Sequence, residues 1–323
     1  MPIVLRGPFT HLATAGGKVT DTTNAYDVAI STDAGCVTII PSYREVKNVS
    51  TGDVSFWFAP ATTTHTTNTL LWQCYGNSSY TTDHSTPVGV WDSNYRSVYL
   101  FPDGTTLSGV DALGNFTLTN HGATADASGI VGGAVAMAGV YLDVANFSLG
   151  GAGDLTCSFW MYSTNFVQDA EIVEKEPVNG DWSVLLTSGG GLQLRGGSSG
   201  SAGTAAPSNN AWHYVVAQIN HAGSVTGSIY VDGSLVIGPI ATVDGIANST
   251  NTLNIGQYTG AGGGFNFNGK LDVIEVSNIL RPVDQGIVEY LNQKPSSTLI
   301  TLGSEVPLGG GAAALPSLGA FVF

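Results

Sequence analysis

The acidic side chains between residues 169 and 176 are the first candidates for chemistry in this chain. The segment reads Asp169-Ala170-Glu171-Ile172-Val173-Glu174-Lys175-Glu176, so Glu174 and Glu176 would share one face of a β-strand. Glycoside hydrolysis needs two carboxyl groups about 5–10 Å apart, one of which acts as an acid. Glycanase sites built on a strand use a longer run of acids at alternate positions, which this segment does not supply. We therefore interpret it as a solvated strand end and predict that the protein is not an enzyme.

The histidines offer no alternative catalytic site. None of the six, at positions 11, 65, 84, 121, 213 and 221, belongs to a recognisable motif with a serine nucleophile. His213 lies in the strand-like segment Trp212-His213-Tyr214, where we expect it to pack rather than to react. The glycines at 260 and 262–264 are typical of a loop tip and not of a phosphate-binding loop. The sequence thus predicts no catalytic residue.

Carboxylates at loops or strand ends suggest a second kind of chemistry, which is calcium binding. Asp143, Asp154, Asp181 and Asp244 could supply oxygen ligands to a calcium ion. The chain has no D-x-D-x-D-G loop, so we expect no cofactor, with calcium as the alternative.

Aromatic residues suggest a third kind of chemistry, which is glycan binding. The faces of sugar rings stack on aromatic rings, while polar neighbours fix the orientation of the sugar. Tyr258, Phe265 and Phe267 surround the glycine-rich loop, and Trp182 follows Gly180-Asp181. These four residues form a candidate glycan platform. The alternative is that they belong to a hydrophobic core.

Composition excludes several classes of partner. The formal net charge is −14, and the ten Lys and Arg residues are spread too thinly to form a phosphate-binding patch, so no nucleic acid is expected. No apolar run approaches the roughly 20 residues that span a bilayer, and we expect no membrane insertion. The first residues, Met1 to Gly7, lack the features of a signal peptide. Charged residues make up only 11% of the chain, as in many extracellular and virion β-proteins.

The cysteines, Cys36, Cys74 and Cys157, are odd in number and far apart in the sequence. Buried free thiols behave as small hydrophobic groups. We favour that interpretation for all of them, with a structural disulfide as the alternative.

A series of strand-like segments positions the candidate residues. Leu155 to Tyr162 alternates, with Phe159 on one face, and Asp232-Gly233 is a favoured hairpin turn. The order Trp212-His213-Tyr214-Val215-Val216, Gly227-Ser228-Ile229-Tyr230-Val231-Asp232-Gly233, Leu253-Asn254-Ile255-Gly256 and Phe267-Asn268-Gly269-Lys270-Leu271-Asp272 resembles laminin-G-like, concanavalin-A-like jelly rolls.

The resemblance covers about 111–293, and Asp111-Ala112-Leu113-Gly114-Asn115 is similar to the opening of such modules. It implies that Phe159 and Trp212 lie between two sheets and that Asp272 has a structural role near a strand start. It also places Ile172-Val173-Glu174-Lys175 in a strand that ends at an edge turn.

Earlier in the chain, Cys74-Tyr75-Gly76-Asn77-Ser78 and Val90-Trp91-Asp92-Ser93-Asn94-Tyr95 resemble a poorly characterised β-domain over about 25–105. That domain often precedes laminin-G-like modules in phage and bacterial surface proteins. We expect an all-β protein with two β-sandwich domains, the second a concanavalin-A-like jelly roll. The expected parts are 1–105 for the N-terminal domain, 106–124 for a bridge, 125–295 for the jelly roll and 296–323 for a tail.

The tail is apolar and uncharged from Gly309 to the terminal carboxylate. Ordering a glycine-rich segment costs about 1–2 kcal/mol per residue, so its large side chains must be buried somewhere. Two interpretations stay open, docking on its own domain or insertion into a neighbouring subunit. The second would make Leu315, Leu318, Phe321 and Phe323 an assembly contact.

The combined prediction is a structural protein of a phage virion, either a capsid decoration or head-fibre protein or a tail-associated one, that carries a laminin-G-like adhesive domain. Its expected partners are other virion proteins and copies of itself, with a host-surface glycan as a further partner. It would be made in the host cytoplasm and located on the particle. The alternative is a lectin-like receptor-recognition protein of a phage or bacterial surface, and a glycan hydrolase is a less favoured third.

Overall fold

The computed structural model describes residues 1–16, 18–60, 69–102, 106–151, 153–175, 181–197, 199–200, 204–241, 245–247, 249–258, 264–307 and 313–316. Within these ranges the chain is built mainly of antiparallel β-strands, which confirms the all-β prediction. The described helices are two short 3-10 turns (Thr14–Gly16 and Val49–Thr51), α1 (Pro87–Val90) and α2 (Val283–Gln293). None of the described helices is long and apolar enough to cross a membrane.

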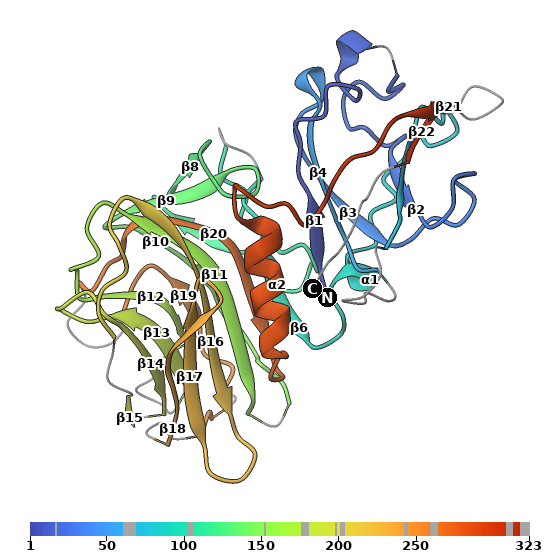
Figure 1. The fold of residues 1–323 in the computed structure, drawn as a ribbon. Helices are drawn as coiled ribbons and strands as arrows, with labels where there is room; N and C mark the ends of the chain where they lie inside the picture. The colour runs from blue at the N-terminus through green and yellow to red at the C-terminus, as the bar shows by residue number, and fades with distance from the viewer. Residues whose placement is uncertain are drawn as a thin grey trace. The chain divides into compact units, whose positions relative to one another are not determined.

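The chain forms two compact units (Figure 1). Unit 1 comprises Met1–Asp92 and Val288–Phe323, and unit 2 comprises Ser93–Ile287. This division differs from the boundary expected at residue 105, because the strand Tyr95–Tyr99 pairs with Asn268–Ser277 inside unit 2. It also differs at the C-terminal end, where a separate tail was expected from residue 296. Residues Ala313–Pro316 there pair with the strand Trp72–Tyr75 of unit 1.

Unit 2 is a sandwich of two sheets, and most of its strands are labelled in Figure 1. In the first sheet the order of the described strands is β18 (Ser234–Ile240), β17 (Thr226–Val231), β16 (Ala211–Asn220), β11 (Leu155–Ser163), β20 (Asn268–Ser277), β9 (Ala134–Ala138) and β8 (Thr124–Asp126), with β6 (Tyr95–Tyr99) also paired to β20. In the second sheet the order is β15 (Ser199–Gly200), β14 (Leu192–Gly196), β13 (Trp182–Leu186), β12 (Ala170–Lys175), β19 (Leu253–Ile255), β10 (Tyr141–Val144) and β7 (Thr119–His121).

The core between these sheets follows the predicted alternation of β11. Phe159 is fully buried with its neighbours on the same face, as expected. The prediction for Trp212 is wrong, because this residue is only partly buried and its ring lies 5.6 Å from that of Tyr162. Trp212 stands opposite Tyr162 in the pairing of β11 with β16, so both belong to the face of the sheet that points away from the core.

Two predicted backbone features are confirmed in unit 2. Asp232 and Gly233 both have positive φ, 52° and 78°, and they connect β17 to β18 as a tight hairpin turn. The Asp272 carboxylate is buried and accepts hydrogen bonds from Ile130 N at 2.7 Å and Val131 N at 2.9 Å. It thereby fixes the segment before β9 to the middle of the long strand β20, whereas the resemblance had placed Asp272 near a strand start.

Unit 1 contains two small sheets around its own hydrophobic core. In the first sheet the order of the described strands is β1 (Ile3–Leu5), β4 (Asp53–Phe58) and β3 (Ser42–Asn48). In the second sheet it is β2 (Ala29–Ser31), β5 (Trp72–Tyr75), β22 (Ala313–Pro316) and β21 (Val306–Pro307). Trp91, from the Trp-Asp-Ser phrase, is fully buried with its ring 5.6 Å from those of Trp57 and Tyr43.

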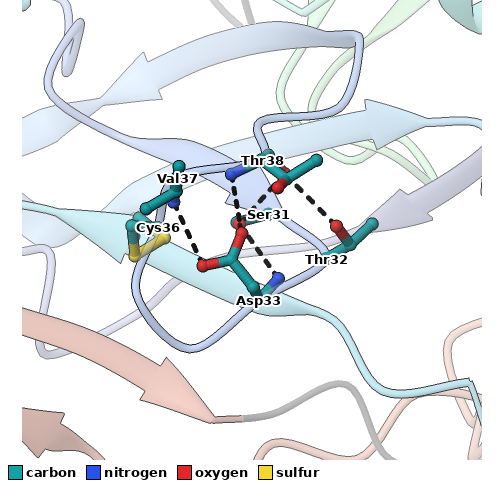
Figure 2. Close-up of a disulfide and its surroundings, with 7 residues drawn as sticks. Ser31, Thr32, Asp33, Cys36, Val37 and Thr38 are labelled. Atoms are coloured by element: carbon teal, nitrogen blue, oxygen red, sulfur yellow. Dashed lines mark hydrogen bonds between the residues drawn. A yellow bond between two sulfur atoms is a disulfide. The ribbon is translucent and has the colours of Figure 1, made fainter.

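The expectation of free thiols is wrong for two of the cysteines. Cys36 and Cys74 form a disulfide with a Cα–Cα distance of 6.0 Å, while Cys157 is free and buried. The disulfide joins β5 to the loop after β2, and Figure 2 shows how Asp33 shapes that loop. Its carboxylate accepts from Val37 N at 3.2 Å and Thr38 N at 2.6 Å, and these bonds lower the pKa of Asp33 to about 2.

The described part of the tail docks on its own chain. The backbone of β22 pairs with β5, with Leu315 opposite Gln73. Near the start of the tail, the Glu305 carboxylate accepts hydrogen bonds from Tyr75 and Lys18, both of unit 1. Leu318, Phe321 and Phe323 lie outside the described residues, so the assembly contact stays a prediction for them.

Candidate functional site

A row of polar side chains crosses the second sheet of unit 2 on the face that points away from the core. We call this the polar row, and its members stand opposite one another in successive strand pairings. They are Arg195 on β14, Ser183 on β13, Glu174 on β12, Asn254 on β19 and Asp143 on β10. Directly paired residues lie on the same side of a sheet, so these side chains form one continuous stripe.

The centre of the polar row is buried, which corrects the interpretation of 169–176 as a solvated strand end. Glu174 has an exposed fraction of 0%, and Ser183 and Asn254 are also buried. β12 lies inside the sheet between β13 and β19, so Glu174 stands between Ser183 and Asn254. Glu176, the proposed partner of Glu174 on the same strand face, lies outside the described residues. Ser183 Oγ and Asn254 Nδ2 are buried, and neither atom makes a hydrogen bond of normal geometry with a residue that the structure describes.

A second group of residues lies at the start of β12, and we call it the Glu171 cluster. Its members are Glu171, Gln257, Tyr258, Phe265 and Asn266. Glu171 N donates to Phe265 O at 3.0 Å, and residues 171 and 266 form a parallel bridge. Phe267 N donates to Gly256 O at 2.9 Å, which brings the neighbouring residues Asn266 and Gln257 close together.

The Glu171 cluster contains acceptor oxygens that nothing in the described structure satisfies. Glu171 Oε2, Gln257 Oε1 and Asn266 Oδ1 are buried and make no hydrogen bond of normal geometry with any described residue. The orientation of the Asn266 amide is fixed, because its Nδ2 donates to Gly139 O at 3.3 Å. Buried polar atoms of this kind normally bond to ordered water or to a ligand.

The charge of Glu171 is only partly compensated. Its exposed fraction is 3%, and Arg195 Nη1 lies 3.3 Å from its Oε1. Burial, together with the negative charges of Glu174 and Asp169, raises the pKa of Glu171 to about 8, although the Arg195 guanidinium and the Ser183 hydroxyl act in the opposite direction. The raised pKa favours the protonated carboxyl group, in which one oxygen carries a hydrogen and donates instead of accepting.

The four aromatic residues proposed for glycan binding fall into two pairs. Tyr258 and Phe265 lie together in the Glu171 cluster, with ring centroids 5.7 Å apart and planes at 79°. Phe265 is 42% exposed. Trp182 and Phe267 are instead fully buried in the sandwich core, because Trp182 alternates inward on β13 and Phe267 immediately precedes β20. The platform prediction is therefore wrong for these last two residues.

Of the aspartates proposed for calcium, the three that the structure describes each have a partner of their own. Asp143 pairs with His121 at 3.1 Å, and Asp154 accepts from His221 N at 2.7 Å. Asp181 is fully buried and pairs with Lys175 Nζ at 3.1 Å, so its charge is compensated by the protein itself. Asp244 lies outside the described residues. Within the described ranges no three His, Cys, Asp or Glu side chains are placed to hold a metal ion.

The structure also reveals a Ser-His-Asp arrangement that the sequence reasoning missed. His213 Nδ1 lies 2.7 Å from Asp232 Oδ2, and its Nε2 lies 3.1 Å from Ser208 Oγ and 3.0 Å from Ser208 O. Burial lowers the pKa of His213, but the bonds to Asp232 and to the Ser208 carbonyl outweigh it and raise the pKa overall. The Ser208 carbonyl can only accept a hydrogen bond, so His213 Nε2 donates to it and is not free to accept a proton from Ser208 Oγ; the network ties the hairpin turn at Asp232 to residue 208.

Comparison with known proteins identifies the family of unit 2. Residues 136–285 match the model described as the concanavalin A-like lectin/glucanases superfamily, in its laminin-G branch. Unit 2 therefore carries a laminin-G-like domain of that superfamily, as the sequence predicted. No curated protein sequence is similar enough to count as a match.

Solved structures of similar fold include several binding domains. The botulinum neurotoxin serotype D/C binding domain is 14% identical, with a TM-score of 0.49 over 65% of this chain and 54% of that one. Domain 4 of AbnA, a GH43 extracellular arabinanase from Geobacillus stearothermophilus solved with arabinotriose, is 15% identical, with a TM-score of 0.49 over 61% and 98%. The Paraclostridial Mosquitocidal Protein 1 binding domain is 16% identical, with a TM-score of 0.46 over 61% and 52%. This chain spans about half the length of the two toxin domains.

Proposed function

We propose that the protein binds a glycan without hydrolysing it, through the Glu171 cluster of its laminin-G-like domain. The observation that carries this proposal is the combination of an exposed ring, that of Phe265, with buried acceptor oxygens that lack partners. A sugar presents an apolar ring face and several hydroxyl donors at fixed angles. Such a ligand would stack on the ring of Phe265 and satisfy the acceptors of Glu171, Gln257 and Asn266. The superfamily description, which names lectins and glucanases, supports this class of ligand.

Burial of Glu174 supports a binding role over a catalytic one. A glycosidase needs two carboxyl groups that both face the scissile bond, one protonated and one ionised. Glu171, with its raised pKa, could serve as an acid. Glu174, the nearest second carboxylate on the strand, has an exposed fraction of 0%, and Glu171 itself is only 3% exposed, so the two carboxyl groups do not both face an accessible bond. We therefore expect no turnover.

A glycan array followed by calorimetry tests the binding proposal. The Phe265→Ala variant should lose about tenfold or more in affinity for any glycan found, since aromatic contacts of this kind contribute on the order of 1 kcal/mol beyond their buried area. Leu235→Ala is the matched control, because Leu235 is also about half exposed but lies on β18 of the other sheet. Equal loss in both variants, or no glycan bound at all, would contradict the proposal.

Release of reducing ends from β-glucans and bacterial polysaccharides tests the absence of hydrolysis. Turnover that disappears in Glu171→Gln or Glu174→Gln would show that the buried pair is catalytic after all. Turnover that survives both changes would point to a contaminating enzyme.

The location on a phage particle is a further part of the proposal and rests on the sequence. It is motivated by the low charge content and by the order of the two modules. Under this proposal the protein is a virion component that presents its glycan site to a host surface. Mass spectrometry of purified particles, in which this chain should appear in stoichiometric amount, tests it, and absence of the chain from such particles would favour a bacterial surface protein.

A further inference from the structure

A cavity in unit 1 takes no part in the proposed glycan site. Its volume is about 110 Å³, and it lies beside the disulfide of that unit. Asp27 and Tyr75 line its buried end, because each of them is only 1% exposed. Ile39 and Tyr80 also line it, and they are exposed and partly exposed, so the cavity opens to solvent on their side. A ligand can therefore enter it.

The walls of the cavity are held in place by covalent and hydrogen bonds. Cys36 and Cys74 both line it, and their disulfide ties the loop after β2 to β5 (Figure 2). Asn77 and Tyr80 line another part of the wall, where Tyr80 N donates to Asn77 O at 3.0 Å and closes a turn. The cavity is thus formed before any ligand binds, and binding need not order a loop first.

The buried end of the cavity carries a negative charge. The Asp27 carboxylate accepts hydrogen bonds from neutral donors, among them Thr20 N at 2.6 Å and Gly76 N at 3.2 Å. None of the ion pairs between described residues includes Asp27. The described residues that line the cavity include no Lys, Arg or His. Because charges interact strongly where the dielectric constant is low, the cavity disfavours anions and favours a cation.

The size of the cavity limits the ligand to a small group. A protein cavity of about 150 Å³ holds a benzene molecule. With about 110 Å³, this cavity has room for on the order of five non-hydrogen atoms. A whole pyranose, which has about twelve, does not fit. The ligand is therefore a compact cation, or the cationic end of a longer molecule that leaves through the opening.

We infer that this cavity binds a methylated ammonium group, such as the trimethylammonium end of choline. Aromatic rings attract such cations to their faces, and Tyr75 and Tyr80 both line the cavity. Asp27 supplies the opposite charge at the buried end. The site lies in unit 1, so it does not depend on glycan binding by unit 2.

Methylation of the ammonium matters because the side-chain acceptors at the cavity are already engaged. Asn77 Oδ1 accepts from Ser79 N at 3.1 Å, and the Asp27 carboxylate accepts from the backbone amides of Thr20 and Gly76. A primary ammonium brings three N–H donors that need acceptors, whereas a quaternary ammonium brings none. The cavity should therefore prefer the quaternary group.

Calorimetry with matched probes tests the inference on the full chain. The probes are choline, ethanolamine, which has a primary ammonium, and 3,3-dimethylbutan-1-ol, the uncharged carbon analogue of choline. We expect choline to bind about tenfold or more tightly than either of the others. Equal affinity for choline and the alcohol, or no binding of choline, would overturn the inference.

Phosphocholine as a further probe distinguishes two sources of the same group. Binding at least as tight as that of choline would support a headgroup carried on a lipid or a polymer. Weaker binding of phosphocholine than of choline would support the free cation, since the phosphate then approaches the negative cavity.

Variants of the partly exposed ring locate the site. Tyr80→Leu should weaken choline binding about tenfold, whereas Tyr80→Phe keeps the ring and should keep the affinity. Tyr141→Leu is the matched control, because Tyr141 of unit 2 is also partly buried and its ring lies 4.2 Å from that of His121, as the ring of Tyr80 lies 4.6 Å from that of His84. Unchanged affinity in Tyr80→Leu, equal loss in Tyr80→Phe, or equal loss in Tyr141→Leu would overturn the inference.

Discussion

Loss of the disulfide between Cys36 and Cys74 should destabilise unit 1 and leave unit 2 unaffected. The bond closes a loop with a sequence separation of 38. For a loop of that length, the chain-entropy model gives about 13 cal/mol/K, which is about 4 kcal/mol at room temperature. This is an upper value, because Asp33 holds the loop through Val37 and Thr38 without help from the disulfide.

Hydrogen exchange on the Cys36→Ser/Cys74→Ser variant measures the effect unit by unit. The amides of β2 and β5 should exchange between a hundredfold and a thousandfold faster than in the parent protein, since each 1.4 kcal/mol is about tenfold. The amides of β11 in unit 2 serve as the internal reference and should not change. A change of less than threefold in β5 would refute the entropic argument.

Thiol counting checks the premise independently. Cys157 is fully buried, and burial, with the charge of Glu275, raises the pKa of its thiol, so the native protein should show no reactive thiol. After unfolding without reductant one thiol should react, and after reduction three should. Three reactive thiols before reduction would show that the disulfide does not form.

Three further predictions follow from the packing of the two units. Phe159→Ala should cost about 3–5 kcal/mol in urea unfolding, whereas Trp212→Ala, a change on the outer face, should cost less than half as much; equal losses would mean that the faces are reversed. Lys175→Met leaves the Asp181 carboxylate buried without its cation and should lower the free energy of unfolding by about 3–5 kcal/mol. The double variant Lys175→Met/Asp181→Leu should recover most of that loss. A double variant no more stable than the single one would contradict the ion-pair argument. Deletion of residues 306–323 should lower the melting temperature of unit 1 without changing the oligomeric state in solution. Loss of oligomers at an unchanged melting temperature would favour the assembly contact.

The sequence determined the class of fold because local rules governed it. Alternation along 155–162 gave the strand β11, and Asp232-Gly233 gave the hairpin between β17 and β18 because both residues adopt positive φ readily. Likewise, the phrase that contains Asp272 indicated a structural carboxylate, which indeed binds backbone amides. The first two features depend on residues that are close in sequence, whereas the role of Asp272 came from the family resemblance and involves Ile130 and Val131, which are distant in sequence.

Only the tertiary structure decided which faces are covered and which distant residues meet. Alternation separates Phe159 from Trp212 only if the pairing of β11 with β16 is known. Cys36 and Cys74 are joined because β2 pairs with β5, and their spacing along the chain carries no such information.

The residues of the candidate site could not be predicted from the sequence for the same reason. Glu174 stands beside Asn254 because β19, from much later in the chain, pairs with β12. Phe265 approaches Glu171 through a backbone hydrogen bond, and the ring of Tyr258 lies against that of Phe265. Composition and local pattern thus set the strands, but pairing between distant segments determines which side chains become a site, since it alone fixes burial, charge environment and distance.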